Sequence, residues 1–152
     1  MKKTLVLCLV LCAGHYLYAQ SPAVRAKHFN LKKKMALQGY DPVSYFKNGP
    51  KKGLEQHQYT HGGVVYYFAN PQNREEFSKA PEQYEPQYGG WCAYAIGATG
   101  DKVKIDPETY KIVDNKLFLF YNFRGHNTLP EWNKDEENLK PAADRYWSEV
   151  VQ

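Results

Sequence analysis

The placement of the cysteines limits how this chain can hold itself together. Two of its three cysteines, Cys8 and Cys12, lie in an apolar stretch near the N-terminus, and only Cys92 lies farther along. If processing removes that stretch, one thiol remains and no internal disulfide can form. The mature protein must then be stabilised by a buried core, which a chain of this length can build without crosslinks.

Residues 1–19 have the features of a signal peptide. Lys2 and Lys3 form a charged start, an apolar stretch covers residues 5–13, and Ala19 completes a small-residue cleavage site. We predict cleavage after Ala19 and an exported protein, periplasmic or extracellular. The apolar stretch is shorter than the roughly 20 residues that cross a bilayer, and no later segment is apolar for long enough. No transmembrane segment is therefore expected after cleavage.

Net charge gives no reason to expect nucleic acid as a partner. The full chain has 20 basic and 16 acidic residues, and cleavage removes two lysines and no acid. The mature net charge is then about +2, too small to favour a polyanion. The basic run Lys32-Lys33-Lys34 is typical of a solvated surface.

Turn signals predict two β-hairpins. Residues 54–69 contain two strand-like runs around Gly62-Gly63, and residues 111–121 contain two more around Asp114-Asn115. Glycine, asparagine and aspartate tolerate the positive φ angles of tight turns at low cost. We expect the two hairpins to form one small antiparallel sheet.

Pairs of a capping residue and a proline predict the helix starts. Asp41-Pro42 begins a short helix, and Asn70-Pro71 begins a second one that ends near Lys79. Apolar residues recur at helical spacings in the tail from residue 129 to residue 150, where Pro141 divides two helices or starts the second. The predicted fold class is α+β, with a small antiparallel sheet from two hairpins, short helices and a C-terminal helical tail.

The chain is predicted to form one domain after cleavage. Residues 20–35 have no clean period and are expected to be a loosely docked N-terminal arm. Residues 36–124 form the folded unit, and residues 125–152 are a helical extension of the same domain.

Four separated motifs link the folded unit to a known family. They are Ala36-Leu37-Gln38-Gly39-Tyr40-Asp41-Pro42-Val43-Ser44-Tyr45-Phe46, Tyr66-Tyr67-Phe68 with Phe77, Pro81 and Tyr84, Tyr88-Gly89-Gly90-Trp91-Cys92-Ala93-Tyr94, and Asp106-Pro107 to Ile112 with Lys116-Leu117-Phe118-Leu119. In this order they resemble the exported, single-domain members of the YHS family. The resemblance implies a YHS-like domain, and it implies metal binding because related domains occur in copper-transporting ATPases. Short metal-associated members have cysteines where this chain has Ala69 and Asn73.

The first functional hypothesis is a non-enzymatic binding domain for copper or zinc that uses Cys92. A thiolate suits Cu(I) and Zn(II), but one cysteine needs help from imidazoles. His57, His61 and His126 are the candidates. On one strand, the Cα atoms of His57 and His61 would lie roughly 13 Å apart, so at most one of these two can join Cys92.

Two alternatives give Cys92 a different role. In the first, the protein binds a small ligand or another protein through an aromatic pocket, and Cys92 is only packed in the core. In the second, Cys92 is a redox-sensing thiol whose pKa is lowered at a helix N-terminus. Common hydrolase, nucleotide-binding and haem motifs are absent from the sequence, so an enzyme is not the favoured hypothesis. The candidate pocket residues are Tyr40, Asp41, Tyr88, Trp91 and Tyr94.

Overall fold

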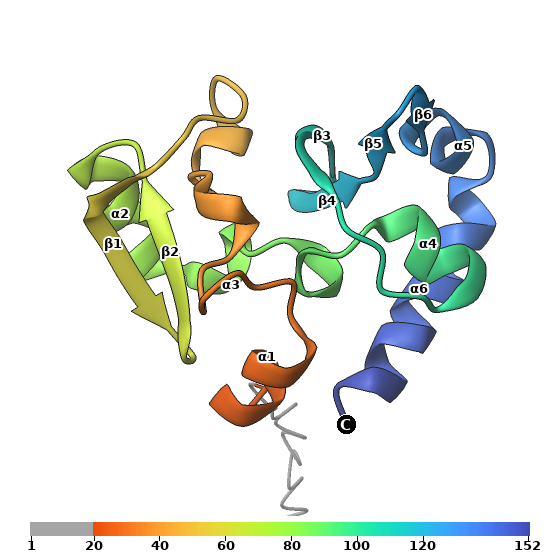
Figure 1. The fold of residues 1–152 in the computed structure, drawn as a ribbon, viewed down its shortest axis with the longest axis horizontal. Helices are drawn as coiled ribbons and strands as arrows, with labels where there is room; N and C mark the ends of the chain where they lie inside the picture. The colour runs from red at the N-terminus through yellow and green to blue at the C-terminus, as the bar shows by residue number, and fades with distance from the viewer. Residues whose placement is uncertain (1–19) are drawn as a thin grey trace, which may run out of the picture.

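The computed structural model describes residues 20–152, and the predicted signal peptide lies outside them. Helices and two-stranded antiparallel sheets alternate along the described chain, which confirms the α+β class. Figure 1 shows one hairpin with its helices at the left of the molecule and the C-terminal helices at the right. None of the helices in this part of the chain combines the length and apolar character needed to cross a bilayer.

The first hairpin is built as predicted. Strand β1 (Leu54–His61) pairs with β2 (Val64–Phe68), and Gly62 and Gly63 turn between them with φ angles of 52° and 79°. Helices α2 (Pro71–Lys79) and α3 (Pro81–Tyr84) follow β2. The Phe77 ring of α2 lies 4.7 Å from that of Tyr66, so helix and hairpin share one aromatic core.

The second hairpin is also present. Strand β3 (Asp106–Val113) pairs with β4 (Lys116–Phe120) around Asp114 and Asn115, whose φ angles are 50° and 56°. Residues 117–120 of β4 are all buried, because alternate side chains enter two different cores. Leu117 and Leu119 face the core of the first hairpin, and Phe118 and Phe120 face the C-terminal helices.

The two hairpins do not join into one sheet. Each forms its own two-stranded sheet, and a third small sheet pairs β5 (Asn122–Phe123) with β6 (His126–Asn127). The outer edge of β4 is occupied instead by the chain before α4, through bridges at Pro86 and Cys92. This segment therefore lies beside β4 on the edge away from β3, which places Cys92 against β4.

Three helices cover the other face of β4. They are α4 (Ala93–Thr99), α5 (Leu129–Lys134) and α6 (Glu136–Val150). The tail divides at Asp135, and Pro141 lies inside α6, so the prediction that Pro141 divides the tail or starts its second helix is wrong. A Cβ on Gly97 would lie 2.6 Å from the carbonyl oxygen of Leu139, so α4 and α6 approach closely at a glycine.

The N-terminal segment is docked rather than loose. Helix α1 (Pro22–His28) is capped by Ser21, and the side chain of Arg25 is buried, where it pairs with Glu85 and donates to Tyr66. Sequence periodicity missed this contact because the inward-facing residue is charged and its partner lies 60 residues away. Buried arginine requires such a partner.

The helix predicted at Asp41-Pro42 is a 3₁₀ turn. It covers Ser44–Phe46, and the Asp41 carboxylate accepts from the backbone N–H groups of Val43 and Ser44, as a cap does. A second 3₁₀ turn, Leu37–Gly39, precedes it. Both turns lie in the core of the first hairpin.

Candidate functional site

Gly89, the first of the two glycines before Cys92, allows close packing. In the turn Gln87–Gly90, both glycines and Tyr88 have positive φ angles. A Cβ on Gly89 would lie 2.8 Å from the ring of Phe29 and 2.8 Å from that of Trp147. The N-terminal segment and α6 therefore meet over this turn, which fixes the start of α4.

Cys92 is fully buried and has hydrogen-bonding neighbours. It is the residue before the first turn of α4, and its exposed fraction is 0%. The Sγ atom accepts from the Tyr121 N–H at 3.4 Å and lies 3.4 Å from the Thr128 hydroxyl. Reactive thiols need access to solvent as well as a lowered pKa, so this burial weighs against the redox-sensor hypothesis.

A cavity of about 350 Å³ lies against Cys92. Helix α4 forms one side of it, and the chain on either side of the β5–β6 hairpin forms another. The surroundings are mainly apolar, with tyrosine, threonine and histidine groups among them. We call this space the Cys92 cavity; its lining residues are Cys92, Tyr94, Ala95, Ala98, Thr99, Val103, Tyr121, His126 and Thr128.

His126 is the one predicted metal-ligand histidine that lines the Cys92 cavity. Its side chain is 59% exposed, its ring centre lies 5.9 Å from that of Tyr121, and its Nε2 lies 3.9 Å from a Glu131 carboxylate oxygen. The imidazole is therefore at the rim, with access to solvent and to a bound molecule.

The other two candidate histidines belong to the first hairpin. His57 and His61 both lie on β1, where His61 Nε2 is 3.4 Å from Glu82, and neither lines the Cys92 cavity. Within residues 20–152, no group of three or more histidine, cysteine, aspartate or glutamate side chains is placed to hold a metal ion. Cys92 and His126 therefore line one cavity, whereas His57 and His61 lie outside it.

Of the five predicted pocket residues, only Tyr94 lines the Cys92 cavity. The Tyr40 hydroxyl donates to Glu108 at 2.8 Å, and the buried Tyr88 donates to Asp144 at 2.9 Å. Burial, and then the Asp144 carboxylate, raise the pKa of Tyr88 above its ordinary value. These two tyrosines connect parts of the fold and do not form a shared pocket wall.

Asp41 and Trp91 also have structural partners. Besides its cap role, the fully buried Asp41 carboxylate accepts from the Ala69 N–H at 2.9 Å and from the Asn73 side-chain amide at 2.6 Å. Trp91 Nε1 donates to the His28 carbonyl at 2.7 Å. Both residues tie separate segments together, which is how buried polar groups usually avoid a desolvation penalty.

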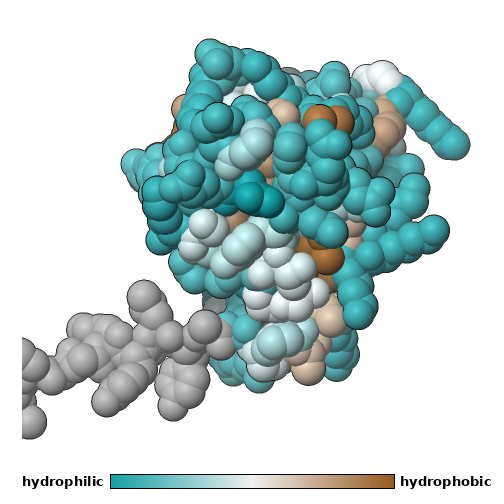
Figure 2. All heavy atoms as spheres, turned by 90° about the vertical axis from the view of Figure 1, so that its left-hand side faces the viewer, coloured by the Kyte–Doolittle hydropathy of each residue, from teal (hydrophilic) through white to brown (hydrophobic). Residues whose placement is uncertain are grey.

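A second hollow, of about 480 Å³, lies between β1 and α2. Its lining is more polar and includes Gln58, Tyr59, Arg74 and Glu75. Glu75 already pairs with Lys79. Figure 2 shows the side of the molecule that carries β1 and α2, and its surface is mostly hydrophilic. The polar share of this lining is larger than in the Cys92 cavity, whereas ligand sites are lined mainly by apolar groups.

Sequence reasoning missed most of the Cys92 cavity. Val103 and Thr128 belong to segments with no recognisable motif, and Tyr121 ends a predicted hairpin strand with nothing to mark it as a site residue. The three meet because β4 lies beside the Cys92 segment. The spacing of Tyr94, Ala95, Ala98 and Thr99 on one helix is the single pattern that could have pointed to a common face.

No protein-family model matches the sequence, and neither the curated proteins nor the solved structures include a match to it.

Proposed function

We propose that the protein is an exported, non-enzymatic domain that binds a small, mainly apolar molecule in the Cys92 cavity. The observation that carries this proposal is the cavity itself, of about 350 Å³, with apolar walls and a few polar groups at hand. Small-molecule sites have this character and fall in a size range of about 300–1,000 Å³.

The shape of the lining supports an aromatic or alicyclic ligand. Ala95 and Ala98 on α4 leave room because their side chains are short, and Tyr94 and Tyr121 offer ring surfaces. Ring pairs favour offset or edge contacts and add affinity beyond buried area. Cys92 supplies wall surface and accepts the Tyr121 N–H, a structural role.

A fragment titration tests the proposal. Protein without the predicted signal peptide, residues 20–152, contains both hydrophobic cores and is titrated with 2-naphthol while the amide and ring signals of Tyr94, Tyr121 and His126 are followed by NMR. We expect a Kd of about 1 mM or tighter, as the ligand efficiency of small aromatics allows. Shifts elsewhere with none at these three residues would contradict the proposal.

A cavity-filling variant provides the control. Ala95→Phe places a ring in the space and is expected to weaken 2-naphthol at least about ten-fold, which corresponds to about 1.4 kcal/mol. Ala26→Phe adds the same ring on the exposed side of α1, away from the cavity, and should leave the affinity unchanged. Circular dichroism of both variants verifies that they remain folded.

A second candidate function is metal binding through Cys92 and His126, because both line one cavity. A thiolate and an imidazole would bind Cu(I) or Zn(II), and the remaining positions would be filled by water or by a ligand. Titration with either ion should give one-to-one binding that both Cys92→Ser and His126→Gln weaken. His57→Gln is the matched control on β1, and an equal loss in that variant would refute this assignment.

Export and family membership are proposed from the sequence. Motifs between residues 36 and 122 support a YHS-like domain, and the character of residues 1–19 supports a cleaved signal. N-terminal sequencing of the protein from the exported fraction should begin at Gln20. A protein that retains Met1 in the cytoplasm would contradict the export proposal.

A further inference from the structure

The Cys92 cavity follows one face of α4. Four lining residues recur at helical spacings from the start of this helix to its end: Cys92, Ala95, Ala98 and Thr99. At about 1.5 Å per residue, the helix rises roughly 10 Å between Cys92 and Thr99. The lining therefore extends along α4, which favours an elongated ligand that lies parallel to the helix.

The two ends of this lining differ in exposure. Cys92, at the start of α4, is buried, whereas Ala98 and Thr99, at its end, are exposed. The other wall changes in the same way, because Thr128 is buried and His126 is exposed. Cys92 Sγ and Thr128 Oγ1 lie 3.4 Å apart, so the two buried residues meet. The cavity therefore has a closed end at Cys92 and Thr128 and an open end that Ala98, Thr99 and His126 line.

The polar atoms at the closed end already have protein partners. Cys92 Sγ accepts from the Tyr121 N–H at 3.4 Å, and the Thr128 hydroxyl donates to the Tyr121 carbonyl at 3.3 Å. A ligand hydroxyl placed here would lose its hydrogen bonds to water and would compete for these partners. An apolar group placed here gains by leaving water. The closed end therefore favours the apolar part of a ligand.

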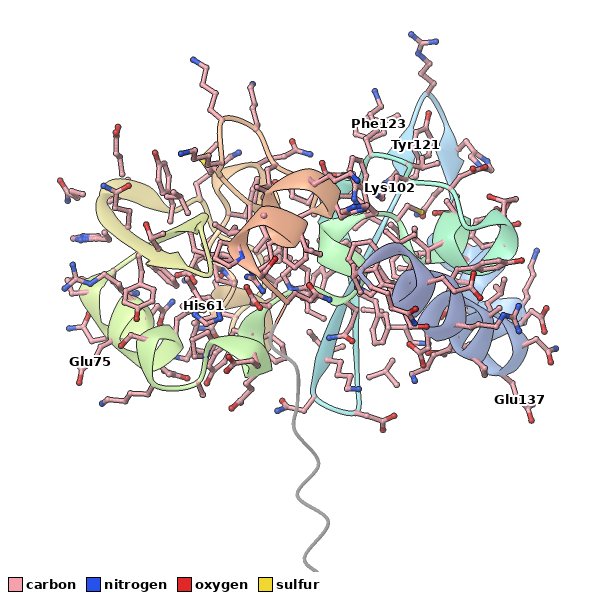
Figure 3. All side chains as sticks on the ribbon, turned by 90° about the horizontal axis from the view of Figure 1, so that it is seen from below. His61, Glu75, Lys102, Tyr121, Phe123 and Glu137 are labelled. Atoms are coloured by element: carbon pink, nitrogen blue, oxygen red, sulfur yellow. The ribbon has the colours of Figure 1, made fainter. Side chains whose placement is uncertain are left out.

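His126 offers hydrogen bonds at the open end. Its Nε2 lies 3.9 Å from a Glu131 carboxylate oxygen, which is longer than a hydrogen bond. A neutral imidazole has one donor and one acceptor nitrogen, so a hydroxyl can bond to it in either tautomer. The ring centre of Tyr121 lies 5.9 Å from that of His126 and provides aromatic surface beside it. In Figure 3, Tyr121 lies on the side of the molecule that carries α4, and His61 lies on the opposite side.

On the basis of the proposed function, we infer that the ligand of the Cys92 cavity is an elongated ring compound with a hydroxyl group at one end only. It lies along α4 with its apolar end at Cys92 and Thr128 and its hydroxyl at His126. The apolar body supplies most of the affinity, because it leaves water. The hydroxyl supplies selectivity, because only the open end has a group that can bond to it while water remains at hand.

A ligand with two distinguishable ends tests this orientation. In 6-methyl-2-naphthol, the methyl and hydroxyl groups lie at opposite ends of two fused rings. Labelled protein, residues 20–152, is saturated with this compound, and intermolecular NOEs are recorded by NMR. We expect NOEs from the ligand methyl to the Thr128 methyl, and from the ring protons beside the hydroxyl to the His126 ring. NOEs from the ligand methyl to His126, with none to Thr128, overturn the inference.

A matched ligand measures the preference for one polar end. In 2,6-naphthalenediol, a second hydroxyl replaces the methyl group at nearly the same size. One hydroxyl must then face the closed end, so we expect the diol to bind about ten-fold more weakly than 6-methyl-2-naphthol. Equal affinities for the two compounds overturn the inference.

Variants of His126 then test the hydrogen bond. His126→Leu removes both ring nitrogens and should weaken 6-methyl-2-naphthol about three- to ten-fold. His126→Gln keeps a donor and an acceptor and should retain most of the affinity, which a purely steric role of the ring would not predict. His57→Leu, on β1 and outside the cavity lining, is the matched control and should bind like the unchanged protein. Unchanged affinity in His126→Leu overturns the role of His126.

The possible failures are distinguishable. A reversed orientation, or equal affinity for the naphthol and the diol, with binding lost in Ala95→Phe, overturns this inference and leaves the cavity as a ligand site. Absence of binding by both compounds and by 2-naphthol overturns the cavity proposal, and the inference with it.

Discussion

Replacing Gly89 with alanine is the sharpest test of how the segment before Cys92 is held. Gly89 has a φ angle of 58°, and a new Cβ would lie 2.8 Å from Phe29 and 2.8 Å from Trp147. Contacts this short require both rings to move. Phe29 directly follows α1, and Trp147 lies on α6. The change therefore disturbs the packing of both the N-terminal segment and the C-terminal helix against this turn.

Two costs and one smaller gain determine the expected change in the free energy of unfolding. A left-handed conformation costs a non-glycine residue roughly 1–2 kcal/mol, and overpacking costs about 1–3 kcal/mol. Alanine also reduces the entropy of the unfolded chain, which returns about 0.4–1 kcal/mol. We therefore expect Gly89→Ala to lower the free energy of unfolding by about 2–4 kcal/mol.

Gly125→Ala is the matched control. Gly125 has a φ angle of 78°, but a Cβ there would have nothing within 4 Å. It bears the same conformational cost without the overpacking, so it should lose about 1 kcal/mol. The difference between the two variants isolates the contribution of Phe29 and Trp147.

Urea denaturation followed by tryptophan fluorescence and circular dichroism measures both variants. If Gly89→Ala and Gly125→Ala lose the same stability to within about 0.5 kcal/mol, the close contact has no energetic role. Gly89 would then be required only for its backbone angle, and the packing argument for this turn would be refuted.

Three further predictions concern buried polar groups. Arg25→Met leaves Glu85 buried without its cation and should lower the free energy of unfolding, measured by urea denaturation, by about 3 kcal/mol. The double variant Arg25→Met/Glu85→Gln should recover part of this loss. A loss below about 1 kcal/mol in Arg25→Met would contradict the buried pair. Cys92→Ala removes the acceptor of the Tyr121 N–H and should cost about 1–3 kcal/mol, whereas Cys92→Ser should cost less; equal losses would refute the hydrogen bond. Burial, and then a hydrogen bond to the Glu76 carboxylate, raise the pKa of Tyr84 to about 12. The neutral phenol therefore contributes its full stabilisation below the ordinary tyrosine pKa of about 10. This contribution is lost as the pH rises from about 10 toward 12. Tyrosinate absorbance and urea midpoints across that range measure it, and a midpoint independent of pH would contradict it.

The sequence by itself determined the local elements. Gly62-Gly63 and Asp114-Asn115 specify tight turns because few other residues adopt positive φ angles cheaply, and Asn70-Pro71 specifies a helix start. These preferences act between residues that are close in the chain. They can be read without knowledge of the rest of the fold.

The tertiary structure decided what the elements build. The N-terminal segment is docked by Arg25 on Glu85, the two hairpins form separate sheets with the Cys92 segment beside β4, and Pro141 is accommodated inside α6. The Cys92 cavity likewise depends on Val103 and Tyr121, which approach α4 only in the folded chain. Such contacts join residues tens of positions apart, and no spacing or turn preference encodes which partners will meet, because burial and charge pairing are settled only when the whole core forms.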